Sequence, residues 1–295
     1  MSPAAPPPAR LYVLTARQSR RAVIFRRGPA KQTLVLAWNL ADDRIAHGQW
    51  LKGRIYERRS DLSPDGDLLA CYVANNRPPL YSWVAISRPP YLTALALWPG
   101  QGMWGGGLFG DDWRTLRLNY LSLSQPLTPT DQERPTSLKV SLITPLVDEE
   151  ALVSLRLERD GWIIRTEGKR IRMKRGSPFQ TRFDPPAIRD KAIGAGGFKL
   201  RVALHGTGET NGSPYVETSQ ILDHQDHLVL DLGRIDWSDI DHNGDVLYAA
   251  HGCLYRLRNQ EIGSEPGRAA PSMIADLNGL DFESVVAPEW ARHWP

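Results

Sequence analysis

The order of apolar and polar residues along the chain is typical of a protein built from short β-strands. Short runs rich in Val, Leu, Ile, Tyr and Trp alternate with turns that contain Gly, Pro, Asn or Asp. This is the spacing of strands joined by tight turns, and no segment shows the 3.6-residue period of an amphipathic helix over three turns. The sequence therefore predicts an all-β fold.

The clearest such pattern lies in residues 236–257. Asn243-Gly244 is a strong hairpin signal, because a type I′ turn requires positive φ at both central positions. His251-Gly252 gives a second turn, and residues 246–248 and 254–257 are rich in strand-forming residues. We predict three strands of a repeated meander here.

Similar patterns divide the chain into five units of about sixty residues each. The first has four strands, the last of them over residues 50–56, and the second has strands at 68–73, 81–86 and 92–98. The third begins at the glycine-rich segment 100–110, contains the long loop 124–137 and ends with a strand at 151–157. The fourth includes a strand at 169–174 and its least regular part at 176–197, and the fifth combines residues 236–257 with 272–277.

Two of the predicted turns share a motif. Leu62-Ser63-Pro64-Asp65-Gly66 precedes an apolar strand, and residues 240–248 repeat the pattern with Asp241-His242-Asn243 in place of Ser-Pro-Asp. A weaker third copy begins at Arg159-Asp160-Gly161. The element resembles the S-P-D-G repeat of TolB-like β-propellers, in which the turn joins the first two strands of a blade. Residues 50–56 and 104–109 are also similar to segments of uncharacterised bacterial proteins.

The resemblance implies a β-propeller, and with five units it implies five blades of about four antiparallel strands. The first two turns should then occupy equivalent places in two sheets, with Leu68 matching Val246. We expect residues 1–10, rich in Pro and Ala, to be a disordered leader and residues 11–295 to form a single propeller domain. Propellers are commonly closed by a strand from one terminus, so residues 11–14 are expected to pair with the last unit.

Composition limits the function classes only weakly. Apolar residues make up 41% and charged residues 23% of the chain, which is ordinary, and the formal charge is +3. Cys71 and Cys253 lie far apart without a C-x-x-C pair, so we expect two reduced thiols. The first residues lack the layout of a signal peptide, and no apolar run approaches ~20 residues. We expect a cytoplasmic protein without membrane contact.

Metal and catalytic signals are weak. Asp239-x-Asp241-x-Asn243-Gly244 reproduces the start of a calcium loop, but Ala250 stands where the bidentate Glu should be. His224 and His227 could contribute to a zinc site or belong to a polar turn. The glycine-rich segments 102–107 and 205–213 lack the Gly-Lys-Ser/Thr of a phosphate loop, and there is no G-x-S-x-G. We predict no catalytic residue, no metal and no cofactor.

Two surfaces are candidates for binding. Trp98, Trp104 and Trp113 surround the glycine-rich segment and could anchor a protein partner, or they could pack between blades. In the predicted strand at 169–174, alternation places Ile171 and Met173 on one face and Arg170, Arg172 and Lys174 on the other. A second basic cluster lies between residues 20 and 31, whereas residues 223–245 hold seven Asp and one Arg. Such charges either bind an oppositely charged partner or form solvated strand faces.

These observations favour a non-catalytic β-propeller that acts as a protein-interaction module or as a subunit of a larger bacterial complex. A propeller enzyme, such as a carboxylate-based hydrolase, or a ligand-binding propeller is the alternative. A nucleic-acid-binding subunit that uses the basic strands is the third reading. The absence of catalytic motifs supports the first reading, since a fold alone does not determine function.

Overall fold

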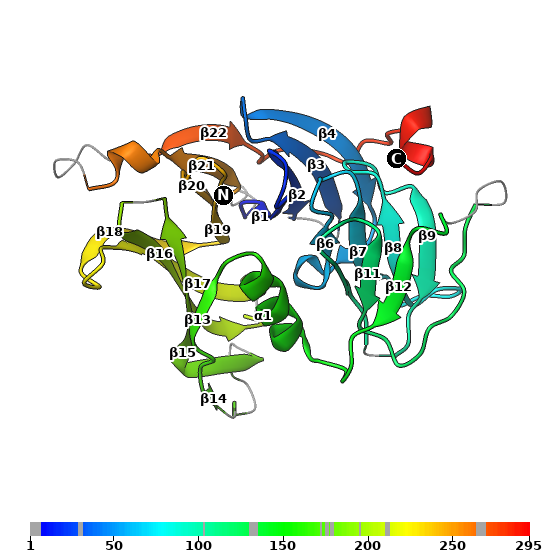
Figure 1. The fold of residues 1–295 in the computed structure, drawn as a ribbon, viewed down its shortest axis with the longest axis horizontal. Coiled ribbons are helices and arrows are strands. Elements are labelled where there is room, and N and C mark those ends of the chain that lie inside the picture. Colours follow the sequence, from blue (N-terminus) through cyan, green and yellow to red (C-terminus); the bar gives the residue numbers. More distant parts are fainter. Residues whose placement is uncertain are drawn as a thin grey trace, which may run out of the picture. The chain divides into compact units, whose positions relative to one another are not determined.

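The computed structural model describes residues 7–28, 32–102, 104–129, 135–171, 173–174, 177, 180–194, 196–209, 213–263 and 270–295. Over these residues the strands form five sheets, accompanied by one α-helix and three short 3-10 helices (Figure 1). The predicted all-β class is confirmed. The chain divides into two compact units, one built from Tyr12–Arg156 and Leu280–Pro295 and the other from Pro8–Leu11 and Leu157–Gly279. A single domain over 11–295 stays a prediction.

The first sheet contains consecutive antiparallel strands. Its order is β1 (Arg10–Thr15), β2 (Arg21–Arg27), β3 (Thr33–Asn39) and β4 (Arg44–Leu51). Two predictions are wrong here. The outer strand covers 44–51 rather than 50–56, because this edge strand has only one buried residue and so lacks an apolar run. The N-terminal strand pairs with β2 and not with the last sheet.

The second and third sheets also belong to the first unit. The second contains β5 (Arg54–Ile55), β6 (Asp61–Leu62), β7 (Leu69–Ala74), β8 (Ser82–Ser87) and β9 (Ala94–Pro99), with the 3-10 helix η1 (Glu57–Arg59) after β5. The third contains β10 (Gly107–Phe109), β11 (Thr115–Leu118) and β12 (Lys139–Leu142), and β11 pairs with β12 in parallel.

The helix α1 (Glu149–Arg159) replaces the strand predicted at 151–157. Asp148 caps its start by accepting a hydrogen bond from the Ala151 amide at 3.0 Å, and two glutamates occupy the first turn. At its end, Gly161 has φ +87°, its amide donates to the Glu158 carbonyl, and the Trp162 amide donates to the Leu157 carbonyl. This is a Schellman motif, so Gly161 terminates a helix and is not a third propeller turn.

The second unit contains two sheets. The larger consists of β13 (Ile163–Thr166), β14 (Arg170–Ile171), β15 (Thr181–Ile193), β16 (Phe198–Thr207), β17 (Tyr215–Leu222) and β18 (Leu228–Ile235). The other consists of β19 (Trp237–Ile240), β20 (Val246–Ala250), β21 (Cys253–Leu257) and β22 (Ser272–Asp276). The 3-10 helices η2 (Asn259–Glu261) and η3 (Glu289–Arg292) follow β21 and end the chain. The meander predicted from 236–257 and 272–277 is confirmed.

The segment predicted to be least regular, 176–197, contains the strand β15. Pro185 and Pro186 interrupt its apolar pattern, which explains the error. The pairing of β15 with β16 shifts between Arg182 and Ala187, so the two prolines fall within an irregularity of the ladder. A proline can be accommodated at such a place because it has no amide hydrogen to donate to the ladder.

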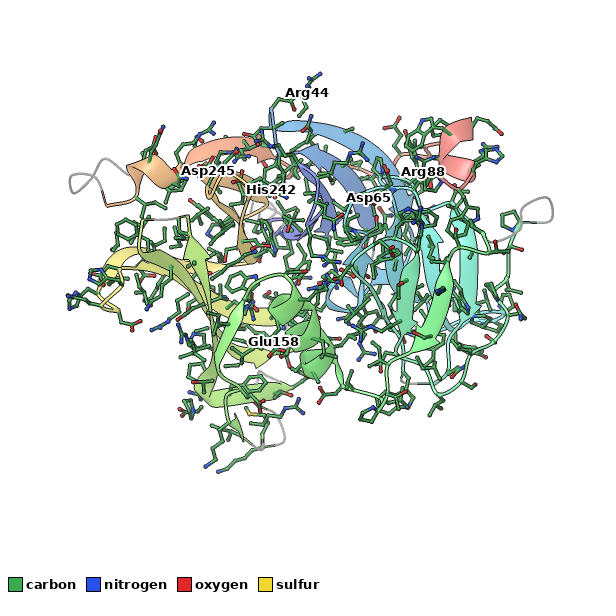
Figure 2. The ribbon with its side chains drawn as sticks, in the orientation of Figure 1. Arg44, Asp65, Arg88, Glu158, His242 and Asp245 are labelled. Carbon is green, nitrogen blue, oxygen red and sulfur yellow. The ribbon has the colours of Figure 1, made fainter. Side chains whose placement is uncertain are left out.

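The two motif turns each join adjacent antiparallel strands, as predicted. Leu62 pairs with Leu69 across the first turn, and Ile240 pairs with Val246 across the second. The second turn is therefore one residue shorter, and by register Val246 matches Leu69 rather than Leu68. The carboxylate of Asp65 accepts from the Asp67 amide at 3.1 Å. The carboxylate of Asp241 accepts from the amides of Asn243 and Asp245 (Asp65 and Asp245 are labelled in Figure 2).

Each unit has its own buried apolar core. In the first unit, Trp98, Phe109 and Tyr120 are at the centre of one cluster, and Phe25 and Leu69 belong to another. In the second unit, a cluster from both sheets includes Trp162, Leu200, Val202, Ile221 and Val246. Of the predicted leader, residues 1–6 lie outside the described part. Ala9 is buried and donates to Asn278 at 2.8 Å, and Arg10 begins β1, so neither belongs to a disordered leader.

Candidate functional site

The three candidate tryptophans have different environments. Trp98 is only 1% exposed and lies in the core of the first unit. The hydroxyl of Tyr120 donates to the Trp98 carbonyl at 3.0 Å and accepts from the Val84 amide at 3.1 Å, which fixes the backbone around it. Trp98 thus cannot contact a partner, and its assignment to the binding surface is wrong because its side chain faces the core.

Trp113 and Trp104 are half-buried. Trp113 packs against the same core, with the Arg114 guanidinium 5.6 Å from its ring centre. Trp104 lies on a hollow of about 700 Å³ in the first unit. Other lining residues are Arg59, Gln101, Leu121, Val147 and Asp148. Of the three predicted anchors, Trp104 alone lines this hollow.

The glycines next to Trp104 are required by close packing of the backbone. A Cβ on Gly105 would lie 2.0 Å from the ring of Tyr72. Gly106 has φ +112°, and a Cβ there would lie 2.8 Å from the Arg59 carbonyl oxygen. A larger residue at either place would displace the strand or the turn that faces it. The two glycines therefore allow the loop to pack closely against its neighbours beside the hollow.

Side-chain amides hold the other walls of the hollow. Gln101 accepts hydrogen bonds from the amides of Leu121 and Ser122 at 2.9 and 3.1 Å and donates to the Ser122 carbonyl at 2.8 Å. Asn119 donates to the Val147 carbonyl at 2.8 Å and accepts from the Val147 amide at 3.1 Å. Each amide side chain thus donates to and accepts from backbone groups, as a neighbouring strand would in a β-sheet. These bonds fix both loops.

A stack of aromatic and charged groups supports the hollow at Arg59. The guanidinium lies 5.7 Å from the ring centre of Tyr56 and 5.4 Å from that of Tyr72. It also forms an ion pair with Glu149 in the first turn of α1, with 2.9 Å between Nε and the carboxylate. Arg59 is largely buried in this arrangement, and its planar group is held by contacts on several sides.

One lining residue of the hollow, Leu121, is the first of three exposed leucines in its segment. Leu121, Leu123 and Leu127 are 62%, 47% and 54% exposed. Leu127 exchanges two backbone hydrogen bonds with Leu97 of β9, at 2.8 and 2.7 Å, so this segment runs along the edge of the second sheet. The polar and proline-bearing composition of residues 124–137 predicts a loop and does not reveal these leucines. The alternation of Leu and Ser at 121–124 was the available signal.

The predicted basic strand is shorter than expected. β14 comprises only Arg170 and Ile171, and Arg172 lies outside the described residues. Arg170 and Lys174 are exposed, but Ile171 is also 38% exposed, so no apolar face is buried here. Arg159 and Arg165 in the same stretch pair with Asp160 and Asp190. Nucleic-acid binding stays a prediction.

The carboxylates of the calcium-like loop are occupied by cations of the protein. Asp241 and Asp245 both contact Arg256, which is 2% exposed, and the Asp245 contact is 3.0 Å long. Asp239 accepts from Lys191 of β15 at 2.7 Å. Calcium binding would require these carboxylates to exchange buried ion pairs for metal bonds. These ion pairs with cations of the protein explain why several aspartates lie in this turn.

The histidine-rich turn is also held by local bonds. Asp223 accepts from the amides of Gln225 and His227 at 2.7 and 2.9 Å and contacts the His227 ring at 3.1 Å. This is the polar turn between β17 and β18 that was one of the two alternatives. Across the described ranges, no three His, Cys, Asp or Glu side chains converge in a way that could hold a metal ion.

Both cysteines are buried free thiols. Burial raises the pKa of Cys71 to about 12, which makes it a poor nucleophile at neutral pH. In the part of the chain that the structure describes, no helix has the length and apolar character needed to cross a membrane.

Comparison with known proteins identifies no family. No family model matches the chain, and no curated protein matches it. Among solved structures, the chain is similar to an uncharacterized protein from Listeria monocytogenes at 12% identity and a TM-score of 0.30, covering 95% of this chain and 86% of that one.

Proposed function

We propose that this chain is a non-catalytic propeller-type protein whose function is to bind another protein at the surface around Trp104. In this proposal the five sheets act as blades, and the binding surface consists of the hollow at Trp104 with Leu121, Leu123 and Leu127. The observation that carries the proposal is that Trp104 and the exposed Leu121 line a hollow whose walls are fixed by hydrogen bonds.

Preorganised walls favour binding at this hollow. A leucine that is fully buried by a partner contributes roughly 1.5–3 kcal/mol, whereas a leucine left in water contributes nothing. Walls that are already fixed lose little conformational entropy on binding, so more of that energy appears as affinity. Apolar side chains exposed singly are ordinary, whereas apolar groups gathered at a concave site are typical of interaction surfaces. We infer that the partner inserts an apolar segment.

Two substitutions test the proposal. Trp104→Ala and Leu123→Asp should each abolish co-purification of a partner from cells that make the protein naturally, while the melting temperature changes by only a few degrees. Tyr81→Ala is the matched control, since Tyr81 is 61% exposed in the same unit and does not line the hollow. Retained partner binding in both variants would refute the proposal, and so would unfolding of Trp104→Ala together with normal binding by Leu123→Asp.

The partner could also be a second copy of the chain. Sedimentation equilibrium of the purified protein separates this case from a different protein. A dimer that Leu123→Asp converts to monomer would identify the partner as the chain itself, whereas a wild-type monomer requires another protein.

A further inference from the structure

The C-terminal arm, Leu280–Pro295, belongs to the first unit but adds no strand to the sheets of the described chain. Its helical turn is η3, drawn in red in Figure 1. The chain reaches the arm from the second unit through Gly279, which has φ +67° and around which a Cβ would meet no atom within 4 Å. The arm therefore follows a residue that has room to change the direction of the chain.

Side chains at the end of the first sheet hold the first half of the arm. The ring of Phe282 packs against that of Trp50 in β4, with 6.1 Å between the ring centres. The Lys52 ammonium lies 4.3 Å from the centre of the Phe282 ring. The Gln49 side-chain amide donates a hydrogen bond to the Val285 carbonyl at 2.8 Å. This half of the arm thus packs against the edge strand of its sheet.

The second half of the arm is held through its two tryptophans. Arg88, labelled in Figure 2, donates from Nη1 to the Trp290 carbonyl at 3.0 Å, and its guanidinium lies 5.0 Å from the centre of the Trp290 ring. Tyr91 packs against the same ring edge-on, at 5.5 Å and 76°. Trp294 packs against the core cluster that contains Trp98. We define the arm site by the side chains outside the arm that make these printed contacts: Gln49, Trp50, Lys52, Arg88 and Tyr91.

The end of the arm also has internal hydrogen bonds. The Ala291 amide donates to the Pro288 carbonyl at 3.0 Å, and the Arg292 Nε donates to the Ala287 carbonyl at 3.0 Å. Because both partners of each bond belong to the arm, the bonds can persist when the arm leaves its site. A segment that keeps its conformation loses less entropy when it docks again.

The docked arm is not perfectly packed. The Trp294 Nε1 is buried without a hydrogen-bond partner among the described residues, which is unfavourable for a donor. Trp290 is 49% exposed and lines a hollow of about 530 Å³ that the arm leaves unfilled. Release would return the Trp294 donor to water, so both features lower the cost of releasing the arm.

We propose that the arm is exchangeable, and that the arm site of one copy of this chain binds the arm of a second copy. The structure identifies the sequence that the site accepts, because the chain's own arm occupies it, and the arm of a second copy carries the same side chains. A tethered arm competes at an effective concentration in the millimolar range, so exchange in the wild type should become detectable only near about 1 mM protein. This association does not involve the surface around Trp104.

Mixing two full-length variants tests the proposal. The site variant, Arg88→Ala with Tyr91→Ala, keeps an intact arm that its own site holds weakly. The arm variant, Trp290→Ala with Trp294→Ala, keeps an intact site that its own arm occupies weakly. Each variant alone should sediment as a monomer, whereas the mixture should form a one-to-one complex with a dissociation constant below about 100 µM, since the intact arm of one chain then meets the intact site of the other.

The matched control replaces an arginine and a tyrosine outside the arm site, Arg44→Ala with Tyr81→Ala. Both side chains are highly exposed, and Arg44 pairs with Asp42. This variant keeps its arm in its own site, so it should form no complex with the arm variant. A synthetic peptide of residues 280–295 should dissociate the complex of the site and arm variants, and a peptide of scrambled sequence should not.

A mixture of the site and arm variants that stays monomeric would overturn the proposal, and so would a control variant that associates equally well. A complex that is lost when both chains carry Leu123→Asp would also refute it, because the surface around Trp104 would then hold the chains together. Equal competition by the scrambled peptide would show that the site does not recognise the arm. If the double arm variant does not fold, Trp290→Ala alone decides the question, since Trp290 is half-exposed and Trp294 stays in place.

Discussion

Arg256 is the residue on which the last sheet depends most. It is 2% exposed and contacts Asp241 and Asp245, which are themselves buried. Replacing it leaves Asp241 buried without this counter-ion and Asp245 with only the ion pair to Arg258, so we expect Arg256→Ala to lower the free energy of unfolding by about 3–5 kcal/mol. Arg258 contacts the same Asp245 at 3.1 Å, but its side chain is 51% exposed. Arg258→Ala should therefore lower it by less than about 1 kcal/mol.

Urea unfolding followed by circular dichroism measures both losses. Equal losses in the two variants would show that burial of the ion pair is not what stabilises this turn. The same experiment on Asp241→Asn should give an intermediate loss, because the amide still accepts hydrogen bonds from the turn but carries no charge.

Asp236 makes the stability of the second unit depend on pH. Burial raises its pKa from 3.8 to about 6, although its carboxylate accepts from the Leu11 amide at 3.4 Å. Between pH 4 and 6 the folded state therefore binds more protons than the unfolded state, so this group favours folding as the pH falls and opposes it above pH 6. Asp236→Asn should raise stability at pH 7.5 by on the order of 1–2 kcal/mol, after allowance for solvent screening.

The difference in unfolding free energy between wild type and Asp236→Asn, measured at pH 5 and pH 7.5, isolates this contribution from other carboxylates. The gain should shrink at the lower pH. A gain that is the same at both values would mean that the pKa of Asp236 is not raised.

Only one of the three tryptophans selected from the sequence lies where a partner could reach a hollow. Trp104 was selected because it adjoins glycines, and the structure places it on a hollow; Trp98 was selected for the same reason and lies in the core. Proximity in sequence does not say which way a strand side chain points. The three exposed leucines were missed because their exposure follows from the pairing of Leu127 with the edge of β9, a contact across thirty positions of the chain.

Among the elements, α1 shows that capping residues can decide between helix and strand where the apolar pattern is ambiguous. Residues 151–157 alternate enough to suggest a strand, yet Asp148 caps the start and Gly161 ends the helix in the left-handed conformation. An alanine at Gly161 would have to adopt φ +87°, although a Cβ there meets no atom within 4 Å. We expect Gly161→Ala to lower the free energy of unfolding by about 1 kcal/mol through backbone strain alone.

Gly53→Ala is a suitable control for the helix cap. A Cβ there makes only ordinary contacts with the Leu51 side chain, and its φ lies outside the left-handed region. Its effect on urea unfolding should stay within about 0.5 kcal/mol, as for most surface substitutions. A loss in Gly53→Ala as large as in Gly161→Ala would contradict the role assigned to the cap.

The elements that the sequence predicted well are those with a turn residue and an apolar run on each side, such as β20 and β21 with His251-Gly252 between them. β4 and β15 were misplaced for two physical reasons. An edge strand such as β4 buries few side chains, and β15 accommodates two prolines by shifting its register. The local sequence pattern does not show which strand lies at the edge of a sheet. It also does not show which partner strand permits a shift of register.

At the scale of the whole molecule, the division into two units has a thermodynamic consequence. Each unit has its own buried core, centred on residues such as Trp98 in one and Trp162 in the other. Cores of this kind can lose their packing separately, and regions that open together form cooperative units smaller than the chain. If the units unfold separately, destabilising one should leave the amides of the other protected from hydrogen exchange.

Hydrogen exchange measured by mass spectrometry on Arg256→Ala tests this separation. Arg256 and both of its carboxylate partners belong to the second unit, so the substitution should speed amide exchange in β15 to β22. Amides of β2, β3, β7 and β8 in the first unit should exchange as in wild type, since none of their contacts is altered. If exchange rises equally in both units, the chain unfolds as one cooperative domain, in agreement with the single domain predicted over residues 11–295. Faster exchange confined to the second unit would instead establish two folding units, and the effects of Trp104 and Arg256 variants on stability should then add independently.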